Sequence, residues 1–257
     1  MKNVTLISDW KLRDPYIGMF KGRLTTVLPD IRMFDITHSV DYQNIQQTAF
    51  ILQNSYTSFP EGTVHIILTG SLFSSPSLPV AVLYDGHYFL GEDNGIFSLL
   101  LGTEINWTAF RFPESEEGKP TISNIIRMAE WIFSGQLEER SVSLSALKRK
   151  LSYVPDYSPV DNKLTGRIVY IDSFCNAVTD IPAGMFTEVA QKRVFTALVG
   201  RGRHLQLSRF HSAYQDQEED VYLVANRMGY IEITMNHGNI AALADLHIGD
   251  VIEINFK

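Results

Sequence analysis

The sequence predicts two domains: an N-terminal α/β domain with a mostly parallel sheet and flanking helices, and an all-β, barrel-like C-terminal domain. Three observations support this division. Apolar runs of strand length alternate with helical segments through the first half, as in parallel α/β proteins. From residue 166 onward, short apolar segments are separated by turns, as in barrels and sandwiches. A polar stretch with prolines lies between them. We therefore predict an α/β domain over residues 1–154, a linker over 155–165 and a β-barrel domain over 166–257.

The first strand and helix frame the first candidate residue for function. The strand is expected to end just before Asp9, and the helix to begin at Asp14 and Pro15, because aspartate caps helices and proline fits their first turn. Asp9 has no such local role. It follows a predicted strand at its carboxyl end, where open α/β sheets bind ligands. Asp9 is therefore the first functional candidate.

The remaining elements continue the two patterns. Further strands of the first domain are expected at 31–36, 64–68, 80–84 and 88–90, and helices at 44–56, 93–101, 122–133 and 144–151. Strands of the second domain are expected at 167–172, 195–199, 204–207, 222–225, 230–234 and 250–254. The Asp85-Gly86 pair between two apolar runs predicts a hairpin. His65 alternates within its strand, so we interpret it as a hydrogen-bonded core histidine.

Composition restricts the class of protein. The net charge of -7 argues against nucleic acid or an anionic membrane as the main partner. No apolar run is long enough to cross a membrane, and the sequence moves straight into a strand, so we expect no signal peptide. Cys175 is the only cysteine, so a disulfide within the chain is excluded and a cytoplasmic location is expected. The histidines show no zinc-binding spacing, and the sequence has no phosphate-binding P-loop, so no metal is expected.

Several short motifs resemble those of the S-adenosylmethionine hydroxide adenosyltransferases, the relatives of fluorinase and chlorinase. They are Ser8-Asp9-Trp10, Asp14-Pro15-Tyr16, Asp35-Ile36-Thr37-His38, Phe59-Pro60-Glu61-Gly62, Asp93-Asn94-Gly95, Ile171-Asp172-Ser173-Phe174-Cys175-Asn176, Gly229-Tyr230-Ile231-Glu232-Ile233 and Asn236-His237-Gly238-Asn239. Each motif is modest alone, but their order and spacing agree over nearly the whole chain. The sequence is therefore identified as a divergent member of this family.

The resemblance implies a homotrimer that binds S-adenosylmethionine (SAM) or adenosine between the nucleoside-binding first domain of one subunit and the second domain of a neighbour. In such a site Asp9 would hold the ribose hydroxyls and Asn176 the adenine edge. Asp172 would face the amino group of the methionine part, and Arg227 a carboxylate. SAM would be the substrate, with no separate cofactor. From the residues alone, other roles stay open: a salt bridge for Asp9, turn-forming contacts for Asp172 and Asn176, and a surface salt bridge for Arg227.

The sequence departs from the resemblance where hydrolytic members carry an Asp, an Arg and a His that position and activate a water. These positions fall here on Gly70, on Ser77 (or Leu78 if the alignment slips by one) and on Pro120. Loss of a water-orienting group typically costs a factor of about 10²–10⁴ in rate. Other polar residues could form a different arrangement, namely Ser71, Ser74, Ser75 and Asp93.

Two hypotheses follow. In the first, the protein is a divergent SAM hydrolase, in which water attacks the ribose carbon bearing the sulfonium and gives adenosine and methionine. In the second, it is a catalytically inactive protein that binds an adenosyl compound or only assembles with other chains. The replacement of all three water-handling side chains favours the second hypothesis, and a turnover assay with SAM separates the two.

Overall fold

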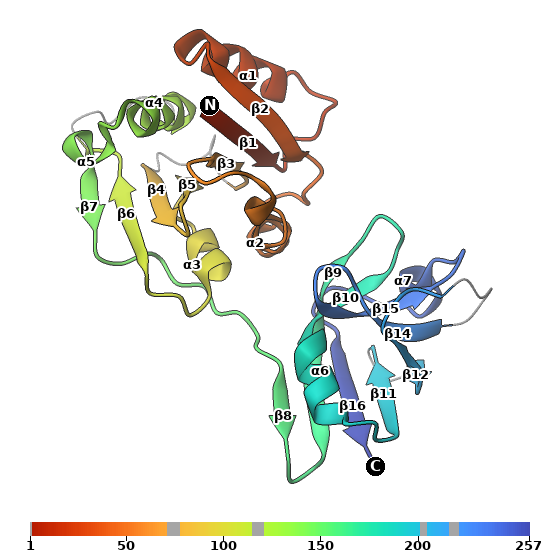
Figure 1. Ribbon diagram of the computed structural model, residues 1–257. Helices are drawn as coiled ribbons and strands as arrows, with labels where there is room; N and C mark the ends of the chain where they lie inside the picture. Colours follow the sequence, from red (N-terminus) through yellow and green to blue (C-terminus); the bar gives the residue numbers. More distant parts are fainter. Residues whose placement is uncertain (1, 71–77, 115–120, 201–204, 216–220) are drawn as a thin grey trace. The chain divides into compact units, whose positions relative to one another are not determined.

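A computed structural model describes residues 2–70, 78–114, 121–200, 205–215 and 221–257 of the chain (Figure 1). The chain divides into two compact units, Met1–Leu151 and Ser152–Lys257, each of which is described by itself. Within the described ranges, no helix is both long and apolar enough to cross a membrane.

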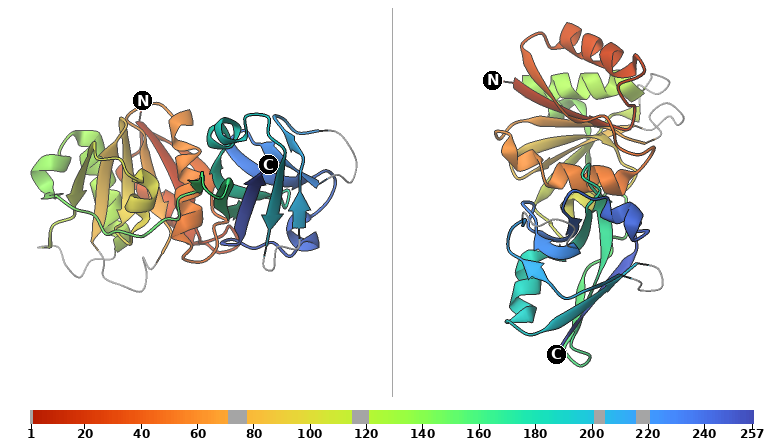
Figure 2. Two further views of the ribbon diagram at one scale, coloured as in Figure 1. Left: turned by 90° about the horizontal axis from the view of Figure 1, so that it is seen from below. Right: turned by 90° about the vertical axis from the view of Figure 1, so that its right-hand side faces the viewer.

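The first unit is a seven-stranded sheet with helices on both faces. Its strands are β1 (Lys2–Ser8), β2 (Ile31–Thr37), β3 (Val64–Leu68), β4 (Pro79–Tyr84), β5 (His87–Glu92), β6 (Trp107–Arg111) and β7 (Val142–Leu144). Its helices are α1 (Tyr16–Val27), α2 (Ile45–Gln53), a 3₁₀ turn (Tyr56–Ser58), α3 (Ile96–Leu101), α4 (Thr121–Ser134) and α5 (Leu137–Arg140). The strand order is β2-β1-β3-β5-β4-β6-β7. Helices α1 and α4 cover one face, and α2 and α3 the other (Figures 1 and 2).

The expectation of a mostly parallel sheet is wrong, because this sheet is mixed. β2, β1, β3 and β5 pair in parallel, whereas β5 with β4, β4 with β6 and β6 with β7 pair antiparallel. The change of direction starts at the Asp85-Gly86 turn, where both residues have positive φ (50° and 74°). A two-residue turn of this kind closes an antiparallel hairpin, so β4 and β5 cannot be parallel.

Alternation along the buried strands divides the core of this unit between the two faces. Leu6 and Ile66 belong to the apolar cluster under α1 and α4, whereas their neighbours Ile7 and Ile67 belong to the cluster under α2 and α3. All five residues of β3 are buried, as expected for a central strand covered on both sides.

His65 is a hydrogen-bonded core histidine, as the sequence predicts. Its Nδ1 lies 2.7 Å from Thr5 Oγ1 and its Nε2 lies 3.1 Å from His87 Nδ1. The His65 ring also stacks on Phe89. Burial, together with the nearby His87, lowers the pKa of His65 to about 3, so the imidazole is neutral at pH 7.

Two local expectations fail in the first unit. Residues 145–150 contain no helix, because the Lys148 and Lys150 backbone N–H groups donate to the side chains of Asp93 and Ser98 instead of to helical carbonyls. Helix α1 is not capped by Asp14: its N-cap residue is Pro15, and no side chain bonds the free N–H groups. Asp14 is therefore an exposed residue without the structural role expected of it.

The second unit is a curled sheet with two short helices, a half-barrel and not a purely β structure. Its strands are β8 (Asp156–Ser158), β9 (Lys163–Ile171), β10 (Ala177–Pro182), β11 (Phe195–Val199), β12 (Leu205–Leu207), β13 (Phe210–His211), β14 (Val221–Ala225), β15 (Tyr230–Met235) and β16 (Val251–Phe256). Its helices are α6 (Ala183–Ala190) and α7 (Ile240–Leu243). The strand order is β12-β11-β16-β9-β10-β15-β14-β13, and β8 pairs with β9. The inner face of the sheet encloses an apolar core that includes Ile168, Phe186 and Ile254.

Candidate functional site

Asp9 lies directly after β1, and backbone groups orient its carboxylate. Asp9 Oδ2 accepts hydrogen bonds from the Gln43 N–H at 2.8 Å and from the Gly70 N–H at 3.4 Å. Gln43 holds a left-handed φ of 56°, an uncommon conformation for a residue with a side chain. None of the ion pairs between described residues includes Asp9, whose exposure is 7%. The carboxylate is thus fixed in place without a neutralising cation from the described part of the chain.

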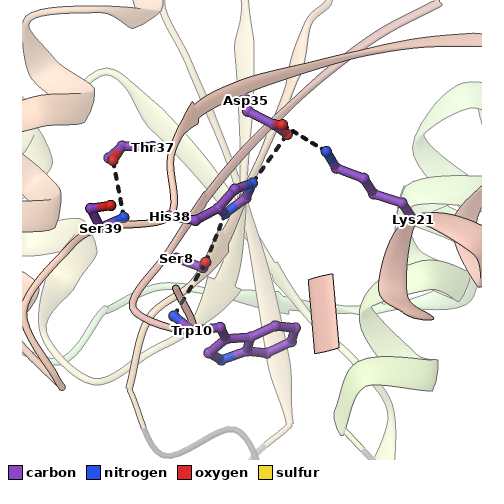
Figure 3. A network of polar contacts seen from close by, with 7 residues as sticks. All are labelled: Ser8, Trp10, Lys21, Asp35, Thr37, His38 and Ser39. Atoms are coloured by element: carbon purple, nitrogen blue, oxygen red, sulfur yellow. Dashed lines mark hydrogen bonds and ion pairs between the residues drawn. The ribbon is translucent and has the colours of Figure 1, made fainter. Parts of the chain in front are cut away.

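A polar network lies beside Asp9, at the ends of β1 and β2 (Figure 3). The buried His38 has its Nδ1 2.8 Å from Ser8 Oγ and its Nε2 3.1 Å from Asp35 Oδ1. Lys21 Nζ donates to Asp35 Oδ2 at 2.6 Å. Burial raises the pKa of Asp35, but the contacts with Lys21 and His38 outweigh burial and hold this pKa below its ordinary value. The network ties α1 to the segment between β2 and α2, which carries Gln43.

Gly70 has no side chain where the resemblance implies a water-handling aspartate, and two other side chains point to the same space. A Cβ placed on Gly70 would lie 2.7 Å from Asn94 Nδ2 and 3.6 Å from Glu92 Oε2. The φ of Gly70 is +115°, which disfavours any side chain there. The side chains of Asn94 and Glu92 therefore border the space that the side chain of an aspartate at position 70 would fill.

The other two positions at which the resemblance implies water-handling side chains provide no candidate replacement among the described residues. Ser77 and Pro120 lie outside the described residues, as do Ser71, Ser74 and Ser75. Leu78, the alternative match for the arginine, is partly buried and packs against the apolar core. The Asp93 carboxylate accepts hydrogen bonds from the Lys148 N–H at 3.0 and 3.2 Å, so it fixes the segment after β7.

Asp172 and Asn176 bracket the tight turn between β9 and β10. Asp172 Oδ1 accepts hydrogen bonds of 2.9 Å from the backbone N–H groups of Phe174 and Asn176. Cys175 takes the left-handed position of the turn, with φ 64°. Asn176 Oδ1 accepts a hydrogen bond of 2.8 Å from the Thr234 hydroxyl on β15. The turn-forming contacts that the sequence left open are thus present, and they fix both side chains.

These residues line an open cavity of about 640 Å³ in the second unit. Its wall contains three of the four ligand-binding residues predicted from sequence: Asp172, Asn176 and Arg227. The remaining wall comes from Phe174, Tyr214, Thr234, Met235, Asn236, His237 and Gly238. Asp9 belongs to the other unit. The cavity combines an anion, an amide and a cation, so it offers partners for both kinds of charge and for a hydrogen-bonding group.

A buried carboxylate, Glu232, supports this wall from behind. Tyr214 donates its hydroxyl to both Glu232 oxygens, at 3.0 and 3.2 Å, and Asn226 Nδ2 donates to Oε2 at 3.0 Å. Burial raises the pKa of Glu232 above its ordinary value, and the nearby Asp172 adds to this rise. Burial and the Glu232 carboxylate also raise the pKa of Tyr214, so the Tyr214 hydroxyl stays protonated at pH 7.

Arg227 lies in the turn between β14 and β15, and Asn226 holds that turn. Asn226 Oδ1 accepts hydrogen bonds of 3.0 Å from the N–H groups of both Met228 and Tyr230. Because Asn226 also donates to Glu232, the position of Arg227 at the cavity depends on the buried carboxylate.

Sequence reasoning missed Glu92, Tyr214, Glu232 and Thr234. Glu92 is the last residue of β5, whose carboxyl end lies beside those of β1 and β3, because Ser8 pairs with Leu68 and Ile66 with Leu90. An acidic residue at that end of a third parallel strand is the signal that could have identified it. Tyr214 had no such signal, because it lies in a loop far from Glu232 in sequence.

No cluster of metal-binding side chains is present in the ranges that the structure describes: no three His, Cys, Asp or Glu residues come together in them. The expectation that the protein holds no metal stays a prediction.

Comparison with known proteins agrees with the family resemblance. A family model described as "SAM hydroxide adenosyltransferase N-terminal domain" matches residues 4–132, and the corresponding C-terminal domain model matches residues 166–253. A protein of Methanocaldococcus jannaschii named (R)-S-adenosyl-L-methionine hydrolase is 23% identical over 98% of this chain and 95% of its own. A protein of the same name from Thermus thermophilus is 30% identical over 38% of each chain.

Solved structures show the same fold. An uncharacterised conserved protein from Thermotoga maritima aligns with a TM-score of 0.86 and 21% identity, covering 98% of this chain and 99% of its own. A conserved hypothetical protein from Thermus thermophilus aligns with a TM-score of 0.75 and 21% identity over the full length of both chains. With both family domains matched in order, the chain belongs to the SAM hydroxide adenosyltransferase family.

Proposed function

We propose that this protein binds SAM and hydrolyses it to adenosine and methionine. The observation that carries the proposal is the 640 Å³ cavity whose wall holds Asp172, Asn176 and Arg227, in a chain with both domains of the family. The names of the two relatives support the same substrate.

The methionine part of SAM has an ammonium and a carboxylate, and the cavity offers one partner for each. Asp172 Oδ1 is occupied by two backbone N–H groups, whereas the one hydrogen bond of Oδ2 to a described residue is a long contact of 3.4 Å to Asn176 Nδ2. The carboxylate can therefore accept a charge-assisted hydrogen bond from the ligand ammonium. Arg227 would bind the ligand carboxylate with its planar guanidinium.

Asn176 and Asp9 would hold the adenosine part. The Asn176 amide has two N–H donors and two acceptor lone pairs, of which Thr234 uses one lone pair and the contact with Asp172 one donor. One donor and one acceptor remain for an adenine edge. Asp9 would accept hydrogen bonds from the two ribose hydroxyls, with Gln43 and Gly70 holding its carboxylate.

The family resemblance leads us to propose a homotrimer in which Asp9 and the Asp172 group serving one ligand come from different subunits. Light scattering coupled to size-exclusion chromatography measures the mass of the assembly. A monomer at micromolar concentration would contradict this part of the proposal. The cytoplasmic location also stays a prediction.

A second candidate function is binding of an adenosyl compound without turnover. Gly70 favours it, because the residue has no side chain where the family resemblance implies a water-handling aspartate. The two functions share the ligand residues and differ only in the fate of bound SAM.

The test is to incubate purified protein with SAM and to follow adenosine and methionine by chromatography, with calorimetric titration of SAM and adenosine in parallel. Asp9→Ala should abolish binding and turnover. Asp30→Ala is the matched control, because Asp30 is an exposed carboxylate of the same unit that lies before β2, outside the connection that carries Asp9. If wild-type protein binds neither compound, both functions fail. Binding of SAM without product would leave only the second.

A further inference from the structure

Glu92 is a buried carboxylate at the carboxyl edge of the first sheet, and the proposed binding roles do not use it. It is the last residue of β5 and only 7% exposed. In the sheet, Pro79 pairs with Glu92, and Ile66 of β3 pairs with Leu90, so Glu92 lies level with the end of β3. Its side chain therefore reaches the edge from which Asp9 and Gly70 emerge.

Two contacts of Gly70 place this carboxylate in the site. The Gly70 N–H donates to Asp9 Oδ2 at 3.4 Å, while the position of a Cβ on Gly70 lies 3.6 Å from Glu92 Oε2. Asp9 and Glu92 thus approach the same glycine, one at its nitrogen and the other where its side chain would begin. A substituent at position 70 would have to take the space that Glu92 faces.

We propose that Glu92 supplies, from the neighbouring strand, the water-orienting carboxylate that position 70 lacks, and is a catalytic residue of SAM hydrolysis. This inference rests on the proposed function. The absence of a side chain on Gly70 leaves room for the carboxylate, and Glu92 Oε2 faces the space in which that side chain would begin, so the carboxylate can take the place of a general base there.

Asn94 is the positioning residue of this arrangement. Its Oδ1 accepts a hydrogen bond of 3.2 Å from the Ile96 N–H at the start of α3. That bond directs Nδ2 toward Gly70, 2.7 Å from the Cβ position. The amide N–H can then donate to the oxygen of the same water that donates its proton to Glu92.

The step balances without another reactant. The water oxygen attacks the ribose carbon bonded to the sulfonium and forms the C–O bond of adenosine. The C–S bond breaks, and its electron pair neutralises the sulfur, which leaves as the thioether of methionine. The proton lost by the water passes to the Glu92 carboxylate and then to solvent. Because the sulfonium is already a good leaving group, orientation of the nucleophile is the main requirement.

The test compares Glu92→Gln with Glu104→Gln, an exposed glutamate of the same unit that is outside the site. Saturating turnover gives kcat, titration of SAM gives Kd, and thermal unfolding checks the fold. We expect Glu92→Gln to lower kcat by a factor of about 10²–10⁴ while Kd stays within about threefold, and Glu104→Gln to change neither.

Glu92→Asp keeps the charge and withdraws it by one methylene, so it decides the matter if Glu92→Gln fails to fold. We expect a kcat between those of wild type and Glu92→Gln. A Glu92→Gln kcat within about threefold of wild type would overturn the inference and leave the proposed function intact. Loss of Kd together with kcat would also overturn it, because the residue would then serve binding or folding. Wild-type protein that binds SAM without turnover would overturn this inference together with the proposed hydrolysis and leave only the binding function, whereas protein that does not bind SAM ends both proposals.

Discussion

Asn176 donates its backbone N–H to Asp172 Oδ1 at 2.9 Å, so one carboxylate both closes the turn before β10 and lines the cavity. These two roles are separable by substitution. Asp172→Asn keeps an acceptor for the two backbone N–H groups and loses the charge. Asp172→Ala loses both.

We expect the free energy of unfolding of Asp172→Asn to stay within about 1 kcal/mol of the wild-type value. Asp172→Ala should lower it by about 1–2 kcal/mol, similar to the cost of removing a side chain that caps a helix. Both variants should bind SAM about 10–100-fold more weakly, because a charge-assisted hydrogen bond to the ammonium is lost. Chemical denaturation and calorimetric titration measure the two effects. Wild-type affinity in Asp172→Asn would mean that the carboxylate serves the turn alone.

Substitution of Gly70 should be costly even when it adds only a methyl group. Gly70→Ala puts a Cβ at 2.7 Å from Asn94 Nδ2 on a backbone with φ +115°. We expect a loss of about 1–3 kcal/mol in the free energy of unfolding, together with reduced turnover. Gly18→Ala is the control, because it lies in α1 with no atom within 4 Å of the new Cβ and should be neutral or stabilising. Equal stability of the two variants would show that Asn94 moves aside freely.

The His65–His87 pair should make the first unit sensitive to acid. His65 is fully buried and its pKa is lowered to about 3 from 6.5, and burial lowers the pKa of His87 as well. Above pH 6.5 both residues are neutral in the folded and unfolded states. Below it the unfolded chain takes up protons that the folded chain cannot, so stability is lost as the pH falls toward 3.

For His65 the expected loss is about 1.4 kcal/mol per pH unit below 6.5. Urea denaturation at pH 7 and pH 5 measures it. His65→Gln should be less stable than wild type at pH 7 but should lose less on acidification, because glutamine does not titrate. An identical pH dependence in the variant would assign the acid sensitivity to other groups.

In the polar network beside Asp9, loss of the buried Ser8 hydroxyl should lower stability more than loss of the exposed Lys21 charge. Ser8→Ala removes the hydroxyl that lies 2.8 Å from the buried His38 Nδ1, so we expect a loss of about 1–3 kcal/mol for a buried polar group left without its partner. Lys21→Met breaks the Lys21–Asp35 pair, whose side chains are 29% and 41% exposed. Such a pair contributes about 0–1 kcal/mol, and thermal unfolding in low and high salt should show this contribution shrinking with salt. A larger loss of stability in Lys21→Met than in Ser8→Ala would contradict the prediction that the buried Ser8–His38 contact stabilises the fold more than the exposed ion pair.

The sequence predicted those elements whose signal lies in neighbouring residues. β3 and the Asp85-Gly86 hairpin are examples, because burial on both faces and turn chemistry are written in adjacent residues. The mixed character of the sheet was not predicted: the hairpin implies one antiparallel pair, but β6 and β7 carry no local sign of the strand each will pair with. The segment before residue 151 failed as a helix because Asp93 and Ser98, distant in sequence, bond its N–H groups.

The same distinction holds for the candidate site. Asp172, Asn176 and Arg227 stand in short motifs, and the structure shows them around one cavity. Glu92 had a signal that was overlooked, its position at the carboxyl end of a parallel strand. Glu232 could not be assigned from local pattern, because its surroundings include Tyr214, which lies on a loop.

The position of β5 between β3 and β4 has a consequence for evolution and engineering. β3 ends at the same edge of the sheet at which β4 begins, because Pro79 pairs with the last residue of β5. The two ends of the connection from Leu68 to Pro79 therefore lie at one edge of the sheet. Insertions or deletions there would leave every described strand pairing in place. A library of grafted loops between Gly70 and Leu78 is therefore a direct route to altered chemistry on an unchanged scaffold.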